Sequence, residues 1–238
     1  MNKAIIIGAS SGIGRELAKI LDAHQFKVGI VARRLDLLKE LQINLQNESY
    51  IKQIDISKIA NAQEKLNELI TQMEGVDLIV ISAGIGYINP ELNLELEMKT
   101  ISTNVMGFTA MANIAIKQFI KQGSGHLVGI SSIAAIRGDG ENPAYNASKA
   151  FMSNYLQGLR KKIIKANLPI IVTDIKPGFV DTAMAKGDNL FWVASREKAA
   201  NQIFNAIKKK KSRVYITKRW SIVAWFLRIL PDVVYNRI

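Results

Sequence analysis

A tyrosine and a lysine four residues apart are the side chains best suited to chemistry. They stand in Tyr145-Asn146-Ala147-Ser148-Lys149, inside a stretch of helical character, so both lie on one helix face. A tyrosine with a pKa near 10 is a poor acid or base at neutral pH. An ammonium about 5 Å away, at an effective dielectric of about 20, favours the phenolate by roughly 3 kcal/mol. The pair predicts general acid–base catalysis by Tyr145, with its pKa lowered by Lys149.

A serine hydroxyl is expected beside this pair. Ser132 lies 13 residues before Tyr145, just past a strand expected over 126–130. Ligands of parallel sheets bind at the carboxyl ends of the strands. A hydroxyl there can bond a substrate carbonyl, so Ser132 is a predicted substrate-binding and catalytic residue.

A glycine-rich turn joins the first expected strand, 4–7, to the first expected helix, 13–24. Glycines permit a tight turn and bring the backbone close to a pyrophosphate, whose charge the helix N-terminus favours. The alternative is that the glycines serve the turn alone. The position before an amphipathic helix favours cofactor binding, and the predicted contacts are Gly8, Ser10, Ser11, Gly12, Ile13 and Gly14.

Two arginines follow the second expected strand, where an acid would favour NAD. The chain reads Val31-Ala32-Arg33-Arg34, with no acid at this point. The planar guanidinium can bond two oxygens of a 2′-phosphate, so Arg33 and Arg34 predict NADP(H), with NAD(H) the less favoured cofactor. The alternative is a solvated surface pair.

The elements that must position these residues alternate along the chain. Strands are expected over 4–7, 28–32, 50–54, 77–81, 126–130, 169–175 and 213–217, and helices over 13–24, 35–45, 58–73, 92–119, 144–166 and 196–209. A break in the long helix is expected near 102–104. Repeated strand–helix–strand units predict an α/β fold with a parallel sheet flanked by helices. At the end of the third strand, Asp55 and Ile56 are expected to line the adenine.

Composition narrows the function further. The 238 residues include no cysteine and only two histidines, His24 and His126, so no metal is expected and a Ser-His-Asp triad has little support. The N-terminus shows no signal-peptide pattern, and no apolar run reaches bilayer length. We expect a cytoplasmic protein, with association at the inner membrane surface if the tail binds lipid.

The motifs occur in the order that is typical of the short-chain dehydrogenase/reductase family. The resemblance runs from residue 3 to about residue 182. It rests on the loop 8–14, Thr103-Asn104-Val105, Ile130-Ser131-Ser132, the 145–149 motif and Pro177-Gly178-Phe179-Val180-Asp181-Thr182. The chain departs from the family at Ile81-Ser82-Ala83-Gly84, where two asparagines often precede Ala-Gly.

This resemblance implies a fold and a set of roles. The fold would be one doubly wound Rossmann-type domain with a seven-stranded sheet. Tyr145 would exchange a proton with the carbonyl oxygen, Lys149 would bond the nicotinamide ribose, Ser132 would polarise the carbonyl, and Asn104 would hold a water. Further cofactor contacts would be Ser82, Ala83, Gly84, Pro177, Gly178, Val180 and Thr182. The substrate wall would include Phe179, Met184, Phe191 and Trp192, which suit an apolar carbonyl compound or alcohol.

Two other classes of function are weighed against an NADP(H)-dependent oxidoreductase. A dinucleotide-sensing or scaffold protein would share the fold without turnover. All four catalytic positions are filled here, which favours an enzyme. The net charge of +12 invites a nucleic-acid partner, but no nucleic-acid motif accompanies it, and none is expected.

Assembly is expected through the helix that carries Tyr145. Phe151, Met152, Tyr155 and Leu159 are spaced to form an apolar face beyond Lys149. Members of the resembled family are commonly dimers or tetramers. We expect a homodimer or homotetramer.

The C-terminal tail is both basic and apolar. Residues 208–238 hold nine basic residues and one acid, and residues 220–230 hold nine apolar ones. We expect residues 1–217 to form the dinucleotide-binding and catalytic part and 218–238 a helical extension of it. A helix this short cannot span a membrane. It packs on its own domain, forms a subunit contact, or lies in a membrane interface, and the sequence leaves these three open.

Overall fold

Seven parallel strands form a single sheet in the computed structural model, which describes residues 2–182 and 191–237. The strands are β1 (Lys3–Ile7), β2 (Lys27–Ala32), β3 (Ser49–Gln53), β4 (Leu78–Ile81), β5 (Gly125–Ile130), β6 (Ile170–Pro177) and β7 (Arg213–Ile216). Their order is β3-β2-β1-β4-β5-β6-β7. The central strands are apolar runs without polar alternation because helices bury both of their faces. The doubly wound Rossmann-type fold is confirmed.

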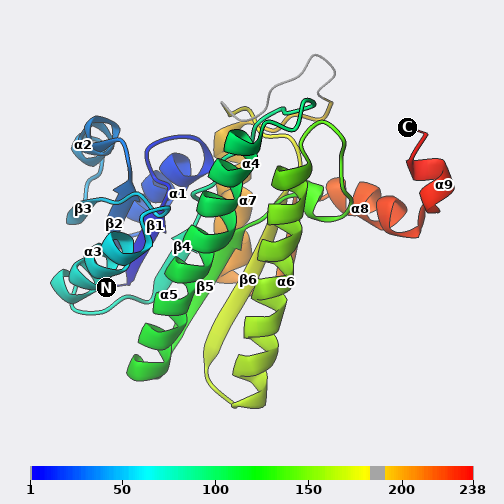
Figure 1. Cartoon of the computed structure of the whole chain (residues 1–238). Coiled ribbons are helices and arrows are strands. Elements are labelled where there is room, and N and C mark those ends of the chain that lie inside the picture. The colour runs from blue at the N-terminus through cyan, green and yellow to red at the C-terminus, as the bar shows by residue number, and fades with distance from the viewer. Residues whose placement is uncertain (1, 183–190, 238) are drawn as a thin grey trace.

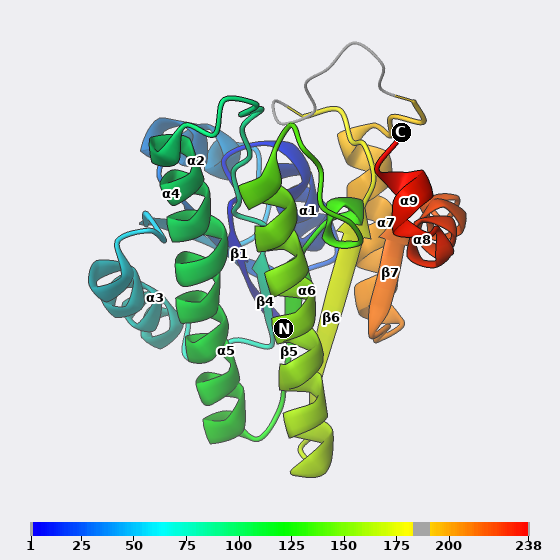
Figure 2. The same cartoon turned by 45° about the vertical axis from the view of Figure 1, so that its right-hand side comes forward.

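Helices cover the two faces of the sheet separately (Figure 1). One core lies against α3 (Ile59–Gln72), α5 (Phe108–Gln122) and α6 (Pro143–Lys165). The other lies against α1 (Gly12–Ala23), α2 (Leu35–Ile43) and α7 (Arg196–Lys208). Figure 2 shows α5 and α6 side by side in front of the sheet. Because the crossovers that leave β1 and β4 pass to opposite faces, the carboxyl ends of these neighbouring strands flank a crevice.

The long helical stretch before β5 is interrupted as the sequence predicts. It divides into α4 (Leu94–Ile101), a π-helical turn η1 (Ser102–Gly107) and α5. The Phe108 N–H donates to the Thr103 carbonyl, five residues back. Such π turns recur at functional sites, and this one holds Asn104.

The apolar face expected on α6 is partly wrong. Met152 is fully buried in the core, and Tyr155 and Leu159 pack against that core from its edge. Phe151 is exposed and stacks on Tyr155, with ring centroids 5.7 Å apart. At about 3.6 residues per turn, position 152 faces the sheet while position 151 faces outward. The apolar face on the outside of α6 is therefore narrower than the sequence predicts.

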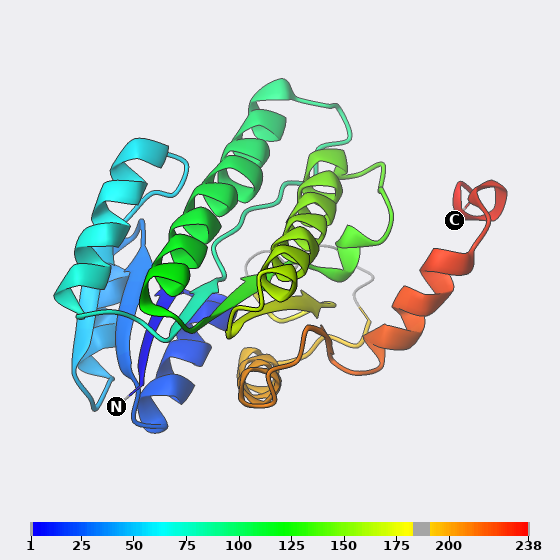
Figure 3. The same ribbon diagram turned by 90° about the horizontal axis from the view of Figure 1, so that it is seen from below.

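Two helices end the described chain beyond β7. They are α8 (Trp220–Ile229) and α9 (Asp232–Tyr235), and they extend away from the sheet (Figures 1 and 3). Within residues 2–182 and 191–237, no helix combines the length and the apolar character that crossing a bilayer requires.

One arginine fastens this C-terminal segment to the loop after β5. Arg137 Nε donates to the Leu227 carbonyl at 2.8 Å, and Nη2 donates to the Leu230 carbonyl. Its Nη1 pairs with Asp232 at 2.6 Å, and its guanidinium lies 5.3 Å from the Tyr235 ring centroid. The last carbonyls of a helix lack partners within the helix, and Arg137 supplies one for the end of α8.

Candidate active site

A cleft of about 1910 Å³ opens at the carboxyl ends of the strands. Small-molecule sites are commonly about 300–1,000 Å³, so this cleft has room for a dinucleotide and a second ligand. Most residues that the sequence predicts for the site line it. From the cofactor set these are Gly8, Ser10, Ser11, Gly12, Ile13, Arg33, Arg34, Asp55, Ile56, Ser82, Ala83, Gly84, Pro177, Gly178, Val180 and Thr182. Ser132, Tyr145, Lys149, Phe179 and Phe191 line it as well.

Three of the predicted residues that the structure describes do not line the cleft in this way. Gly14 lies beneath the loop, and Asn104 lies behind Gly84. Trp192 lies outside the lining, exposed over the aromatic residues described below. Met184 falls outside the described residues.

The β1–α1 turn is built by close backbone approach. Gly8 has φ +101°, and a Cβ there would lie 2.5 Å from the Ala83 nitrogen. A Cβ on Gly14 would lie 2.3 Å from the Gly8 carbonyl oxygen. Only glycine therefore fits at either position. The resulting turn places the N-terminus of α1 against the cleft, where it favours an anion.

Arg34 lies across this turn. Its Nη2 donates to the Ser10 hydroxyl at 2.9 Å and to the Ser11 hydroxyl at 2.7 Å. Arg33 is exposed at the same end of the cleft and carries no ion pair among the described residues. Two guanidiniums thus stand in the cleft that the glycine-rich turn lines.

The tyrosine, the lysine and the serine meet at the other end of the cleft. Tyr145 and Lys149 lie one turn apart near the start of α6, and Lys149 Nζ is 5.6 Å from the Tyr145 ring centroid. Ser132 ends the loop after β5 and begins the short helix η2 (Ile133–Ala135). Lys149 is buried, and its Nζ donates to the Ile130 carbonyl at 3.0 Å.

The expected direction of the Tyr145 pKa is wrong for this arrangement. Burial raises the pKa of Tyr145, and the nearby Ser132 hydroxyl only partly opposes that rise. Burial also lowers the pKa of Lys149 to about 8, with Asp174 raising it and Lys176 lowering it. The prediction rested on the Lys149 ammonium alone, whereas loss of water around the buried phenol disfavours its charged form. Tyr145 is therefore a protonated group at neutral pH.

Asn104 braces the strand end behind the cleft. Its Oδ1 accepts from the Ile85 N–H at 2.9 Å, and its Nδ2 donates to the Ile85 carbonyl at 2.7 Å. The same Nδ2 donates to Ser148 Oγ at 2.9 Å. The side-chain amide is thus committed to protein partners. The water that the family resemblance assigns to this position would have to bind the backbone of η1.

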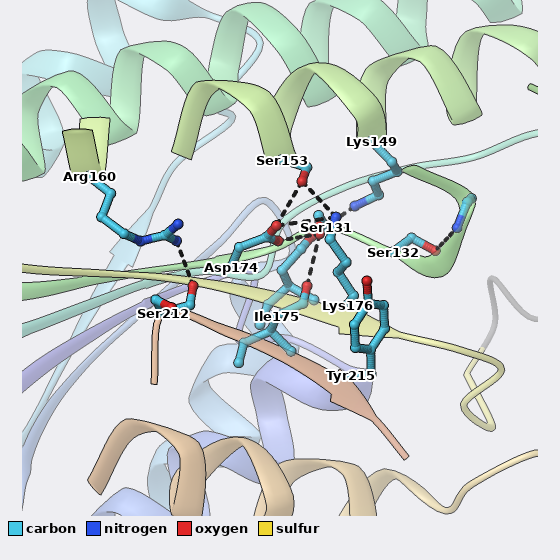
Figure 4. Close-up of polar contacts among 12 residues, drawn as sticks. Ser131, Ser132, Lys149, Ser153, Arg160, Asp174, Ile175, Lys176, Ser212 and Tyr215 are labelled. Carbon is cyan, nitrogen blue, oxygen red and sulfur yellow. Dashed lines mark hydrogen bonds and ion pairs between the residues drawn. The ribbon is translucent and has the colours of Figure 1, made fainter. Parts of the chain in front are cut away.

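A buried ion pair supports the site from below, and the sequence analysis missed it (Figure 4). Lys176 Nζ lies 3.2 Å from Asp174 Oδ2, and both side chains are 2% exposed. The Asp174 carboxylate accepts from the Ser131 hydroxyl and, at 2.7 Å, from the Ser153 hydroxyl. Ser153 Oγ in turn accepts from Lys176 at 2.6 Å. Asp174 thereby holds the residue next to Ser132 and supplies negative charge near Lys149.

One signal for this pair was present in the sequence. Asp174 and Lys176 are opposite charges two positions apart in a strand whose other residues, apart from Thr173, are apolar. Alternate residues of a strand share a face, and a charge in a doubly covered sheet needs a partner. The pair and the hydroxyls around it could therefore have been expected.

Aromatic rings form one wall of the cleft. Trp220, the first residue of α8, contacts Phe179 and Phe191, each with its ring centroid 5.3 Å away. Trp192 packs on the outside of Trp220 at 6.1 Å. Two further residues of α8, Val223 and Leu227, continue this wall into the cleft. The tail helix therefore packs on its own domain and lines the cleft, which is one of the three alternatives left open by the sequence.

The lowered pKa of Lys149 predicts a pH-dependent stability. Its pKa is about 8 when folded against a model value of 10.5, so between these values the unfolded chain binds one more proton. Stability then rises with pH over that window, and below the window the destabilisation by the buried ammonium is complete and no longer changes with pH. The free energy of unfolding of the wild type minus that of Lys149→Met should increase by about 2 kcal/mol between about pH 7.5 and about pH 9.5. Urea unfolding at both pH values measures it, with Lys39→Met at an exposed lysine as the control. A difference that stays constant with pH contradicts the prediction.

Known proteins of similar sequence share this architecture. The family model described as short chain dehydrogenase matches residues 2–192. An uncharacterized oxidoreductase of Myxococcus xanthus is 30% identical over 240 residues, which cover 98% of this chain and 94% of the relative. A 3-oxoacyl-[acyl-carrier-protein] reductase of Bos taurus is 28% identical over 77% of this chain and 80% of its own length.

Solved structures agree at the level of the fold. A short chain dehydrogenase from Burkholderia cenocepacia in complex with NADP superposes with a TM-score of 0.84 at 20% identity, over 99% of this chain and 96% of that one. A 3-ketoacyl-(acyl-carrier-protein) reductase from Brucella melitensis complexed with NADH gives a TM-score of 0.80 at 22% identity, over 90% and 96%. The motif order, the sheet and the match across four fifths of the sequence lead to one conclusion: the chain belongs to the short-chain dehydrogenase/reductase family of oxidoreductases.

Proposed function

We propose that the protein is an NADPH-dependent reductase of apolar ketones or aldehydes. One observation supports this most strongly. A single cleft holds two arginines beside a phosphate-binding turn at one end and the Tyr145–Lys149–Ser132 group at the other. Neither feature alone would specify a reaction. Together they fit a dinucleotide that extends along the cleft, with a substrate carbonyl next to Tyr145.

The cofactor end fits NADP(H) by its charge and its shape. The close approach of Gly8 and Gly14 to neighbouring backbone leaves the α1 N-terminus open to a pyrophosphate. Arg33 and Arg34 would hold the adenosine 2′-phosphate, and Asp55 and Ile56 would border the adenine. When bound, NADPH supplies the hydride that converts a carbonyl carbon to an alcohol carbon.

The protein's own groups supply the proton and the alignment. The Ser132 hydroxyl donates a hydrogen bond to the carbonyl oxygen and fixes its position. Burial raises the pKa of Tyr145, so its phenol is protonated at neutral pH. Its proton can pass to the alkoxide that hydride transfer leaves, because an alkoxide is a stronger base than the phenolate. Lys149, held by the Ile130 carbonyl, stabilises the phenolate that remains and bonds the ribose.

The substrate class follows from the wall of the cleft. Phe179, Phe191 and Trp220 present aromatic faces, and Val223 and Leu227 present aliphatic ones. A carbonyl compound with an apolar body fits this lining. Lipid-like ketones and aldehydes are the proposed substrates.

Cofactor preference is the first test. Titration of the protein should give tighter binding of NADPH than of NADH by more than about tenfold, since two guanidiniums face the 2′-phosphate. Arg33→Asp should remove most of this preference and leave NADH binding nearly unchanged. Lys39→Asp, the same change of charge on the exposed side of α2, should keep the preference. Equal or tighter binding of NADH by the wild type would overturn the assignment.

Turnover is the second test. A panel of apolar ketones and aldehydes is assayed by the loss of NADPH absorbance. Tyr145→Phe should lower kcat by about 10³-fold while NADPH affinity stays within twofold, because only the proton donor is lost. Tyr155→Phe on the same helix should be active, since Tyr155 packs on the core away from the cleft. Normal turnover by Tyr145→Phe contradicts the mechanism, and inactivity of the wild type with tight NADPH binding favours a sensing role.

Assembly is the third test. We propose a dimer or tetramer in which α6 packs on a second copy, because Phe151 stands exposed on that helix. Light scattering of the wild type should give at least twice the chain mass of 26.4 kDa. Phe151→Glu should give a single-chain particle, and Ile43→Glu, an exposed isoleucine on α2, should not. A wild type that is a single chain at micromolar concentration refutes the proposal.

A further inference from the structure

The outward face of α8 carries a continuous row of apolar side chains. We call Ile222, Trp225, Phe226 and Ile229 the outer stripe. Their spacing of three, four and seven residues places them on one side of the helix, opposite Trp220 and Ala224, which are buried. Ile222 is 68% exposed and Trp225 is 62% exposed. Figure 3 shows why: α8 extends beyond the edge of the sheet, with other elements on one side of it only.

Basic residues surround this stripe. Lys218 and Arg219 precede α8, Arg228 lies in its last turn, and Arg237 follows α9. Asp232, the one acid of residues 208–238, pairs with Arg137. The nine basic residues of that segment make no ion pair among the residues that the structure describes. An apolar stripe within a positive surface is the result.

Neighbouring contacts hold two of these cations near the stripe. The Arg219 guanidinium lies 5.1 Å from the Trp192 ring centroid, and Arg228 donates to the Tyr215 hydroxyl at 2.9 Å. Neither contact neutralises the charge. Both side chains are exposed and can contact anionic groups next to the outer stripe.

We infer that α8 binds an anionic lipid surface, with the outer stripe inserted between headgroups and the surrounding lysines and arginines on their phosphates. A ten-residue helix is about 15 Å long, half the hydrocarbon thickness, so it lies along the interface instead of crossing it. Its tryptophan and phenylalanine are side chains that such interfacial helices place at headgroup depth.

Charge decides between lipid and a second copy as the occupant. A two-fold contact would place this patch against its own image. Each copy brings Lys218, Arg219 and Arg228 next to α8, and the one acid nearby, Asp232, is already paired with Arg137, so the two patches would repel each other. An anionic membrane surface attracts the same residues and still covers the apolar stripe.

The side of α8 opposite the outer stripe faces the cleft. Trp220, Val223 and Leu227 line the cleft, so one helix separates the cleft from the lipid. An apolar molecule dissolved in the bilayer would have only this helix to pass. The lipid contact itself does not depend on the proposed reaction and is tested without it.

Vesicle co-sedimentation of the full chain tests the inference. The protein should pellet with vesicles of equal parts phosphatidylcholine and phosphatidylglycerol at low salt, and binding should weaken as salt is added. It should pellet far less with phosphatidylcholine alone. Protein that stays in the supernatant with the anionic vesicles at low salt overturns the inference.

A matched pair of variants localises the contact. Ile222→Glu should weaken vesicle binding by about tenfold, because it places a charge in the stripe. Ile43→Glu, at an isoleucine 84% exposed on α2, makes the same chemical change elsewhere and should bind like the wild type. Circular dichroism melts are the control for folding, and both variants should unfold at temperatures close to that of the wild type. Equal binding by the two variants refutes the role of the stripe.

Fluorescence identifies the inserted side chain. Vesicles of brominated lipid should quench the wild type, and Trp225→Phe should lose most of that quenching while it still pellets. Unchanged quenching in Trp225→Phe contradicts insertion of the stripe. If light scattering shows that Ile222→Glu halves the particle mass and neither form pellets, a second copy covers the stripe and the lipid inference is wrong.

Discussion

The contact between the carboxyl ends of β1 and β4 is the constraint on which the rest of the molecule depends. These strands are neighbours in the sheet, and the chain leaves them toward opposite faces. Gly8 meets the backbone of Ala83 so closely that no side chain fits between them. The two helical layers separate there, and the cleft is the space that they leave. Loops from strands far apart in sequence can share one site because they all end at this edge.

Much of the fold and of the site was predictable because it follows from local patterns. Apolar runs and helical spacing gave the strand and helix order, and the glycine spacing gave the turn before α1. The break at η1 was predictable because the helical stretch 92–119, which contains Asn104, is unusually long for one helix. Such features depend on residues near one another in the chain.

What the sequence did not reveal depends on burial and on distant partners. The Tyr145 pKa is raised because helix and loops remove water from the phenol, which a four-residue spacing cannot show. Arg137 meets Leu227 and Asp232 across ninety or more residues, and no local pattern links them. The ion pair of Asp174 and Lys176 was easier to predict than these contacts, since its two charges share one face of one strand.

The packing of Trp220 joins the C-terminal segment to the cleft. The family model ends at residue 192, yet Trp220, Val223 and Leu227 complete one wall of the cleft. A Cβ on Gly178 would lie 2.0 Å from the Trp220 ring, so the tail also rests directly on the loop after β6. A substitution in the last twenty or so residues would therefore reshape this wall from outside the segment that the family model covers, while the sheet and the glycine turn keep their own contacts. The loop of Gly178 limits such changes, since it has to accept whatever replaces the Trp220 ring.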